Sequence, residues 1–413
     1  MPVEKVVVIH MMKNLIDVDF LFPVEPNTHR LEREKGEEPF SEKAIAWLHA
    51  LSLILSSYPE TRLHPDVATF AFFCRKANLM LLKKQYYPGN SLRTGRGLVF
   101  HITPKNVPTT FAYSLVCGIL SGNANSVKVP SRMLEETGII CRAIQKLGGE
   151  KAHQAISSRQ ALVRYDHQSS ATAYFSSICD VRIIWGGDAT IDEIRKHRLS
   201  PRAFDIAFAS RNSLCIINAD RYIRNNMPGV IATGFYNDTY LFDQEACTSP
   251  NLIVWIGSDE NIEIAKSTFW ANLHELVKST YHLQPHAAVD KLTAFYRQTT
   301  QSEGLIKTVM PDNLIWRTEL RTLPGDFENY HCGGGYFSEC KATSLSDLSA
   351  IISGKYQTLC YYGFEKQELI DFIALTRPND IDSIVPIGRT TEFSLTRDGY
   401  NLIDTLSSEI TVI

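Results

Sequence analysis

The stretch that decides the fold runs from residue 98 to residue 129 and reads LVFHITPKNVPTTFAYSLVCGILSGNANSVKV. Its first residues, 98–103, are apolar and partly β-branched, which predicts a buried strand. Residues 108–122 are apolar on nearly every side, which predicts a buried helix, and residues 126–129 predict the next strand. A strand, a helix and a second strand in this order are the unit of a mostly parallel sheet.

The same alternation continues on both sides of this stretch. Further strands are expected at 161–165, 181–186, 205–209 and 213–218, and further helices at 131–147 and from about Thr190. A second block begins after about residue 212, with long helices near 258–279 and 286–300. On the amino side, apolar residues recur at helical spacing from 41 to 87, which predicts two amphipathic helices. The sequence therefore predicts two α/β lobes in succession.

Composition excludes several classes of protein. The 413 residues carry 42 Lys and Arg against 45 Asp and Glu, a net charge of −3, so a nucleic acid is not the expected partner. The longest apolar stretches are too short to span a bilayer, and the first residues lack the apolar run of a signal peptide. Nine cysteines without a C-x-x-C motif argue against a disulfide framework and favour the reducing cytoplasm.

One cysteine stands apart from the other eight. Cys247 lies in a polar turn, residues 243–250 (DQEACTSP), just ahead of the apolar run NLIVWIG, whereas most of the others lie in apolar runs. Buried cysteine behaves as a small apolar residue, but a cysteine in a polar turn can be exposed enough to react as a thiolate. An inert turn cysteine explains the same pattern equally well, because the sequence shows no histidine beside it.

Two turns after predicted strands carry polar side chains. Asn106 precedes the helix at 108–122, where its amide either donates to a developing oxyanion or simply caps the helix; residue type alone favours the cap. Lys128 lies near the carboxyl end of a strand and is followed by Ser131 and Arg132. This set suits a ribose and a phosphate, although a solvated lysine is the more common case.

Glycines provide two further candidates. Gly186 and Gly187 form a strand–glycine–helix turn that lets backbone amides approach a pyrophosphate, and an ordinary turn fits the same residues. Cys332 and Cys340 flank three glycines, but their spacing is not that of a zinc knuckle, so we expect no metal site. The sequence also lacks the G-x-S-x-G motif of serine hydrolases and the P-loop motif of nucleoside triphosphatases.

Taken in order, these segments resemble the aldehyde dehydrogenase superfamily. More narrowly, the chain from about residue 95 onward resembles the acyl-CoA reductase family, which includes the fatty acid reductase of bacterial bioluminescence. The segment DQEACTSP resembles that family's nucleophile segment, and residues 385–389 with 398–403 resemble its C-terminal segment. The resemblance implies an aldehyde dehydrogenase-like α/β fold, with a Rossmann-type cofactor domain and an α/β catalytic domain.

The resemblance also implies roles for single residues. Cys247 matches the catalytic thiol, and Asn106, in a turn that resembles P-W-N-F-P, matches the amide that helps form the oxyanion hole. The implied cofactor-binding residues are Lys128 at the adenosine ribose, Ser131 and Arg132 beside it, Gly186 and Gly187 below the pyrophosphate, and Glu339 at the nicotinamide ribose. The match at Glu339 lacks the family's accompanying Phe.

Two departures from the superfamily pattern refine the expected activity. Ala207 stands where hydrolytic aldehyde dehydrogenases have the Glu that activates water, which disfavours hydrolysis of an acyl-enzyme. Ser131 stands where NAD-preferring members place a Glu, and Ser131 with Arg132 can accept a 2′-phosphate. The resemblance therefore implies a reductase of acyl thioesters that prefers NADPH, with NADH left open.

The expected reaction reduces an acyl-CoA or acyl-protein thioester, with a fatty acyl group, to an aldehyde through an acyl-cysteine. Two alternatives stay open: a CoA-acylating aldehyde dehydrogenase working in the oxidative direction, and a non-catalytic acyl-binding scaffold. The expected organisation is a helical segment at 1–94, an NAD(P)-binding domain at 95–211, a catalytic domain at 212–385 and a C-terminal segment at 386–413. By analogy we expect a homo-oligomer and an acyl-transferring partner protein.

Overall fold

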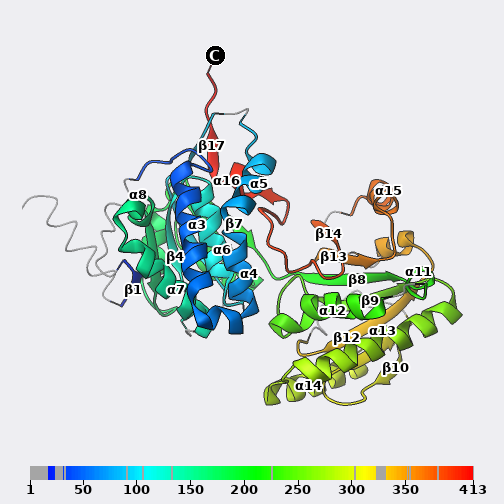
Figure 1. Cartoon of the computed structure of the whole chain (residues 1–413). Coiled ribbons are helices and arrows are strands. Elements are labelled where there is room, and N and C mark those ends of the chain that lie inside the picture. The colour runs from blue at the N-terminus through cyan, green and yellow to red at the C-terminus, as the bar shows by residue number, and fades with distance from the viewer. Residues whose placement is uncertain are drawn as a thin grey trace, which may run out of the picture. The chain divides into compact units, whose positions relative to one another are not determined.

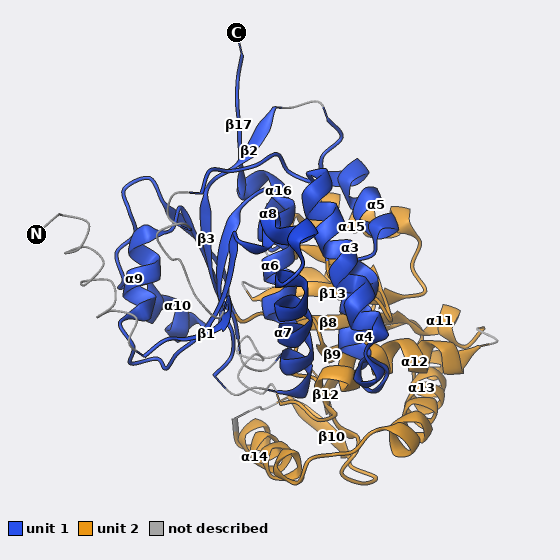
Figure 2. Cartoon of the chain, turned by 60° about the vertical axis from the view of Figure 1, so that its left-hand side comes forward, with its two compact units in different colours: residues 1–209, 394–413 blue, residues 210–393 orange. Residues whose placement is uncertain are grey.

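The computed structural model divides the chain into two compact units (Figure 2). Unit 1 comprises Met1–Ala209 and Ser394–Ile413, and unit 2 comprises Ser210–Phe393. Each unit is built on a largely parallel sheet, so the predicted α/β fold with mostly parallel strands is confirmed. The structure describes residues 17–23, 31, 34–89, 92–104, 107–131, 134–224, 227–301, 304–321, 332–350, 352, 355–378 and 381–412.

Unit 1 contains a six-stranded sheet with the order β1-β5-β4-β3-β6-β7. The strands are β1 (Asp19–Phe22), β5 (Gln160–Arg164), β4 (Ala124–Lys128), β3 (Leu98–Ile102), β6 (Val181–Trp185) and β7 (Phe204–Phe208). β1 pairs antiparallel with β5, and the other neighbouring pairs are parallel. The chain order reverses beside β3, because β4 and β5 lie on one side of it and β6 and β7 on the other.

Helices cover both faces of this sheet (Figure 2). α6 (Thr110–Leu120), α7 (Glu135–Gly148) and α3 (Glu42–Ser57) lie on one face, and α9 (Ala171–Ile178) and α10 (Asp188–Arg195) lie on the other. Phe100 of β3 packs in one apolar cluster with Phe175 and Ile191 of the second face. A parallel strand covered on both faces needs apolar side chains on both, which is why all five residues of β3 are buried.

The amino-terminal helices differ from the prediction. The structure has three helices in place of the two expected between 41 and 87, namely α3, α4 (Pro65–Phe73) and α5 (Lys76–Tyr86). The second predicted helix breaks because Arg75 takes an extended backbone conformation. The Asn78 side chain then donates to the Phe73 carbonyl oxygen at 2.8 Å, which satisfies a carbonyl that the break leaves open.

Unit 2 contains a seven-stranded sheet with the order β10-β11-β12-β9-β8-β13-β14. The strands are β10 (Leu305–Val309), β11 (Trp316–Leu320), β12 (Tyr336–Ala342), β9 (Pro250–Ile256), β8 (Asn212–Asn218), β13 (Tyr356–Tyr362) and β14 (Ser383–Pro386). β10 is antiparallel to β11, and the other pairs are parallel. The starts of β8, β9 and β12 therefore share one edge of the sheet.

The helices of unit 2 lie on both faces of its sheet (Figure 1). α12 (Pro228–Thr239) and α13 (Asp259–Thr280) cover one face, and α15 (Lys366–Thr376) lies on the other. Ser258 is the N-cap residue of α13, and its hydroxyl accepts a hydrogen bond from the Asn261 N–H. At 22 residues α13 is the longest helix described, and no helix in the described ranges is long and apolar enough to cross a membrane.

Residues 394–413 pack in unit 1. β17 (Ser407–Glu409) pairs antiparallel with β2 (Arg93–Gly95). The Asn123 amide, at the start of the turn into β4, donates to the Leu406 carbonyl oxygen at 2.9 Å. These contacts fix the end of the chain to the amino ends of the strands of unit 1.

Candidate active site

Cys247 lies in a short turn at the start of β9. The chain leaves α12, passes through a single 3-10 turn (Tyr240–Phe242), and reaches β9 at Pro250. The Ser249 N–H donates to the Ala246 carbonyl oxygen at 2.9 Å, which closes the turn around Cys247. The Ser213 hydroxyl at the start of β8 donates to the Cys247 carbonyl oxygen at 2.7 Å. The thiol is therefore carried on a backbone that the two neighbouring strands hold in place.

Cys247 also differs from the other cysteines in burial. All nine cysteines lie in described residues; eight are buried and Cys247 is half-buried. Burial raises the pKa of Cys332 to about 11 and those of Cys117 and Cys340 to about 12, because a thiolate is poorly solvated in an apolar core. These buried thiols are held in the unreactive form at neutral pH, and Cys247 alone has the partial exposure that a nucleophile needs.

In unit 1, predicted cofactor residues gather at the carboxyl edge of the sheet. Lys128 at the end of β4 is in register with Ile102 of β3, which is in register with Ile184 of β6. Gly186 and Gly187 follow β6 directly, and Ser131 follows β4 on an exposed turn. This edge includes the place beside β3 where the chain order reverses, which is where open α/β sheets bind ligands.

The two glycines lead into the N-terminus of α10. Gly187 is the cap residue of this helix, and no side chain caps the helix with a hydrogen bond. A Cβ atom at Gly186 would lie 3.2 Å from a side-chain carbon of Thr190, so a larger residue would crowd the first turn. An uncapped helix N-terminus presents backbone N–H groups that suit a phosphate.

Lys128 projects toward the neighbouring strand. Its side chain is half-buried, and its ammonium nitrogen lies 4.5 Å from the ring centroid of Tyr165, which follows β5. The carbonyl oxygen of Lys128 accepts a hydrogen bond from the Thr103 hydroxyl at 2.7 Å. A cation above an aromatic face is attracted by the negative face of the ring, which holds the ammonium group beside the edge of the sheet.

Two predicted site residues cannot be placed. Asn106 and Arg132 lie outside the described residues, so their predicted roles at the oxyanion and beside the ribose stay predictions.

Glu339 lies on β12 inside unit 2 and is 2% exposed. Its Oε1 atom accepts hydrogen bonds from the indole N–H groups of Trp255 and Trp270 at 2.9 and 2.7 Å. Its Oε2 atom lies 3.6 Å from the Lys266 ammonium and 3.7 Å from the Arg317 guanidinium. The carboxylate thus has four partners within its own unit, and the ribose contact predicted for it stays a prediction.

The sequence reasoning missed a buried histidine in β3. His101 is fully buried, with Nδ1 at 2.7 Å from the Ser114 hydroxyl and Nε2 at 2.9 Å from Asn125 Oδ1. The Trp185 indole can only donate to the Ser114 oxygen, so the hydroxyl proton points to His101 Nδ1, and Nε2–H donates to Asn125. This neutral chain joins β6, α6, β3 and β4 just below the edge that carries Lys128 and Gly186.

Burial lowers the pKa of His101 from 6.5 to about 4, because the imidazolium would lose its hydration. The unfolded chain binds this proton near pH 6.5 and the folded chain only near pH 4. The contribution of neutral His101 to the free energy of unfolding is therefore fully present above pH 6.5. It is lost as the pH falls toward 4, by about 3 kcal/mol in all. We expect the free energy of unfolding of His101→Gln, measured with urea between pH 7 and 4.5, to lack this loss. If the free energies of unfolding of the variant and the wild type fall in parallel with pH, His101 is not the group responsible.

Asp238 of α12 was also missed. It is buried and accepts hydrogen bonds from the Gly388 N–H at 2.6 Å and the Thr390 N–H at 2.9 Å. Burial raises its pKa to about 6. Gly388 has φ of +93°, and a Cβ atom there would lie 3.0 Å from the Gly234 Cα, so both glycines are needed for this close approach. Asp238 thereby fixes the 385–389 segment on α12.

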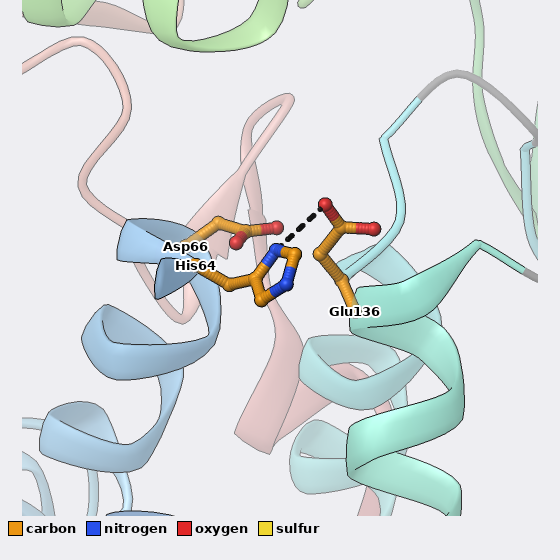
Figure 3. Close-up of side chains that lie close together, drawn as sticks. All are labelled: His64, Asp66 and Glu136. Atoms are coloured by element: carbon orange, nitrogen blue, oxygen red, sulfur yellow. Dashed lines mark hydrogen bonds and ion pairs between the residues drawn. The ribbon is translucent and has the colours of Figure 1, made fainter. Parts of the chain in front are cut away.

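His64, Asp66 and Glu136 meet in unit 1 where α4 and α7 begin (Figure 3). His64 Nδ1 lies 3.1 Å from Glu136 Oε1, and His64 Nε2 lies 3.6 Å from Glu135 Oε2. All three carboxylates lie in first helical turns, where N–H groups stabilise negative charge. A histidine with carboxylates can bind a divalent cation, but helix termini and ion pairing account for this cluster, and we still expect no metal.

Known proteins share sequence with this chain. A family model described as Acyl-CoA reductase (LuxC) matches residues 77–319. The long-chain acyl-protein thioester reductase of Photorhabdus laumondii subsp. laumondii is 27% identical over 198 residues, which are 47% of this chain and 38% of that protein. The reductase of the same name from Aliivibrio fischeri is 27% identical over 167 residues, 40% of this chain and 33% of that protein. The chain thus matches less than half the length of these relatives.

Solved structures share the fold at low sequence identity. Aldehyde dehydrogenase 21 from Physcomitrella patens, in complex with succinate, superposes with a TM-score of 0.66 at 10% identity, over 89% of this chain and 85% of that one. Lactaldehyde dehydrogenase from Escherichia coli gives a TM-score of 0.63 at 11% identity, over 90% and 86% of the two chains. The aldehyde dehydrogenase-like fold expected from the sequence is therefore confirmed.

Proposed function

This chain belongs to the acyl-CoA reductase family, whose model matches more than half of its residues, and we propose that it reduces an acyl thioester to an aldehyde with a nicotinamide cofactor. The observation that carries the proposal is Cys247, the half-buried cysteine on a closed turn at the start of β9. Cysteine forms and breaks acyl thioesters readily, which suits a covalent acyl carrier. The relatives named acyl-protein thioester reductases support the same class of substrate.

In the proposed reaction the Cys247 sulfur attacks the carbonyl carbon of the bound thioester. The carbon–sulfur bond to the donor thiol breaks, the donor leaves with a proton, and the acyl group stays on Cys247. The Asn106 amide, carried over from the family resemblance, donates to the oxyanion. Loss of one such donor typically costs about 2.7–4 kcal/mol of barrier.

The carboxyl edge of unit 1 fits a nicotinamide dinucleotide. Gly186 and Gly187 leave the uncapped N-terminus of α10 open to a pyrophosphate, and Lys128 with Ser131 offers donors to the adenosine ribose. When bound, the nicotinamide supplies the hydride that converts the acyl group to an aldehyde and returns the thiolate. Ala207 in β7 cannot act as a general base, which favours this outcome over hydrolysis.

We propose NADPH as the preferred cofactor, because Ser131 and Arg132 can accept a 2′-phosphate that a Glu would repel. We expect Ser131→Glu to lower the preference for NADPH over NADH by roughly tenfold, since a carboxylate facing a phosphate costs about 1.4 kcal/mol or more. The ratio of dissociation constants for the two cofactors, measured by fluorescence titration, checks this. Ser56→Glu, which adds the same charge on an exposed position of α3, is the control. An unchanged ratio in Ser131→Glu would place the 2′-phosphate elsewhere.

The proposed function is tested with purified protein, NADPH or NADH, and acyl-CoA substrates from short to long chains. We expect oxidation of the cofactor with one aldehyde formed per hydride, identified by gas chromatography. An acyl group on a carrier protein is the second donor, since the relatives are named for acyl-protein substrates. Cofactor oxidation without aldehyde, or no cofactor oxidation with any donor, would overturn the proposal.

We also propose that the reaction takes place in the cytoplasm, which the absence of disulfides among the nine cysteines supports.

A further inference from the structure

A glutamine three residues before Cys247 is anchored by all of its polar atoms. Gln244 is 1% exposed. Its Nε2 atom donates to the carbonyl oxygens of Pro250 and Tyr336, each at 3.1 Å. Its Oε1 atom accepts from the N–H groups of Gly335 at 3.0 Å and Tyr336 at 3.1 Å. A carboxamide offers two donors and one oxygen with two lone pairs, so its capacity is fully used.

The Gln244 carboxamide acts as an extra peptide group between two strands. β9 and β12 are in parallel register, with Leu252 opposite Ser338, so their first residues, Pro250 and Tyr336, lie side by side. Pro250 has no N–H to offer to the ladder. The glutamine amide supplies donors at this point, and it therefore ties the segment ahead of Cys247 to the starts of both strands.

The backbone of this segment needs such an anchor. Asp243 and Gln244 have φ values of +51° and +61°. Two successive non-glycine residues in the left-handed region cost roughly 1–2 kcal/mol each. The four hydrogen bonds of the Gln244 side chain, and the bond from its N–H to the Thr239 carbonyl oxygen at 2.8 Å, offset that cost.

The glycines at 333–335 close over the same segment. The Gly334 N–H donates to the Asp243 carbonyl oxygen at 2.7 Å. A Cβ atom at Gly333 would lie 2.5 Å from that oxygen and 2.7 Å from Glu245 Oε1, so only glycine fits. The buried Lys291 ammonium donates to the Gly334 carbonyl oxygen at 2.7 Å. The glycine loop and the segment that leads to Cys247 are thus interlocked.

We propose that Gln244 is a positioning residue that sets where the Cys247 sulfur lies. This inference rests on the proposed function, in which Cys247 is the nucleophile. Gln244 does not contact the substrate; it acts on the reaction by holding the turn that carries Cys247. Gln244 fixes the turn on its upstream side, and the Ser213 hydroxyl fixes the Cys247 carbonyl. Without the carboxamide, the starts of β9 and β12 lose their bridge and the left-handed segment relaxes. A misplacement of about 1 Å can slow a positioned reaction by roughly a hundredfold.

The test compares Gln244→Met with Gln298→Met. Gln298 on α14 (Pro285–Gln301) is the matched control, because it is also a buried glutamine of unit 2 and accepts a hydrogen bond from the Tyr336 hydroxyl at 2.5 Å. Three quantities are measured in each protein: the melting temperature, the rate of acylation of Cys247 by a fatty acyl-CoA at saturation, and the rate of its alkylation by iodoacetamide. Mass spectrometry of the peptide that contains Cys247 follows both reactions.

We expect both variants to lose similar stability, and only Gln244→Met to change the chemistry of Cys247. Its acylation should be roughly a hundredfold slower at saturating acyl-CoA, with the half-saturating concentration little changed. Its alkylation should be severalfold faster, because a relaxed turn exposes a thiol that is half-buried in the native protein. Gln298→Met, with a similar loss of stability, should change neither rate, so the comparison separates positioning from a general loss of stability.

Equal acylation rates in the two variants would overturn the positioning role. If the wild-type protein is alkylated but never acylated, the proposed function is contradicted, and the alkylation rates then decide on positioning by themselves. In that case, faster alkylation of Gln244→Met than of Gln298→Met supports the role, and equal rates overturn it.

Discussion

Replacement of Cys247 by alanine is expected to abolish aldehyde formation. Without the thiol no acyl-enzyme forms, and loss of a covalent nucleophile lowers turnover by at least roughly 10⁴-fold. The folded protein should keep its affinity for the cofactor, because Cys247 is not among the proposed cofactor residues, which belong to unit 1 apart from Glu339. Steady-state oxidation of NADPH with an acyl-CoA, combined with a fluorescence titration of NADPH, measures both properties.

Cys340→Ala is the matched control for this prediction. Cys340 lies on β12 of the same unit, is 3% exposed, and has a pKa raised by burial to about 12. Its replacement should leave turnover within about twofold, since an unreactive core thiol contributes packing alone. Mass spectrometry should find the acyl adduct on Cys247 in this control and in the wild type. Aldehyde formation by Cys247→Ala at the control rate would refute the acyl-cysteine intermediate.

Much of the fold follows from local sequence patterns. The run at 98–129 predicts β3, α6 and β4 because a parallel strand covered on both faces is mostly apolar, and so is the helix α6 that packs on it. The break between α4 and α5 was missed because the sequence there, FFCRKAN, has neither Pro nor Gly. The Asn78 side chain, which donates a hydrogen bond to the Phe73 carbonyl oxygen, is one of the contacts that mark the end of α4.

The sequence identified those residues of the candidate site that stand out by their type and by the local turn in which they lie. Cys247 stands out because its polar turn interrupts apolar runs, and it is the one cysteine that is not buried. Gln244 did not stand out, since its main partner Tyr336 is 92 residues away and its burial depends on the pairing of β9 with β12. One signal was available: a Pro at the start of a central strand leaves a missing donor that another group must supply.

The same limit applies to His101 and Asp238. A histidine in an apolar strand reads as a core residue, and its partners Ser114 and Asn125 come from the next helix and the next strand. Asp238 is bound to backbone groups 150 and 152 residues away, so no local pattern distinguishes it from a solvated helix residue. Sequence patterns identify residues that react, whereas the groups that hold them depend on contacts made after the chain folds.

Removal of the Glu339 side chain is expected to cause a large loss of stability. Glu339 faces the Lys266 ammonium and the Arg317 guanidinium and accepts two indole N–H groups, all inside unit 2. Lys266 is 6% exposed and, among the described residues, its remaining ion-pair partner once Glu339 is gone is Glu319 at 2.9 Å. Breaking a buried ion pair by removing one partner typically costs roughly 3–5 kcal/mol, and here the indole N–H groups of Trp255 and Trp270 also lose their acceptor.

We therefore expect Glu339→Ala to lower the melting temperature by roughly 10 °C, measured by tryptophan fluorescence, to which Trp255 and Trp270 contribute. Glu263→Gln is the control, because Glu263 pairs with Lys341 at 3.1 Å on the surface of the same unit and an exposed pair contributes at most about 1 kcal/mol. The dissociation constant of the cofactor from Glu339→Ala distinguishes a role in stabilising the core from the ribose contact that the family resemblance implies. If Glu339→Ala melts like Glu263→Gln but binds the cofactor tenfold more weakly, then the carboxylate serves the ribose and not the core.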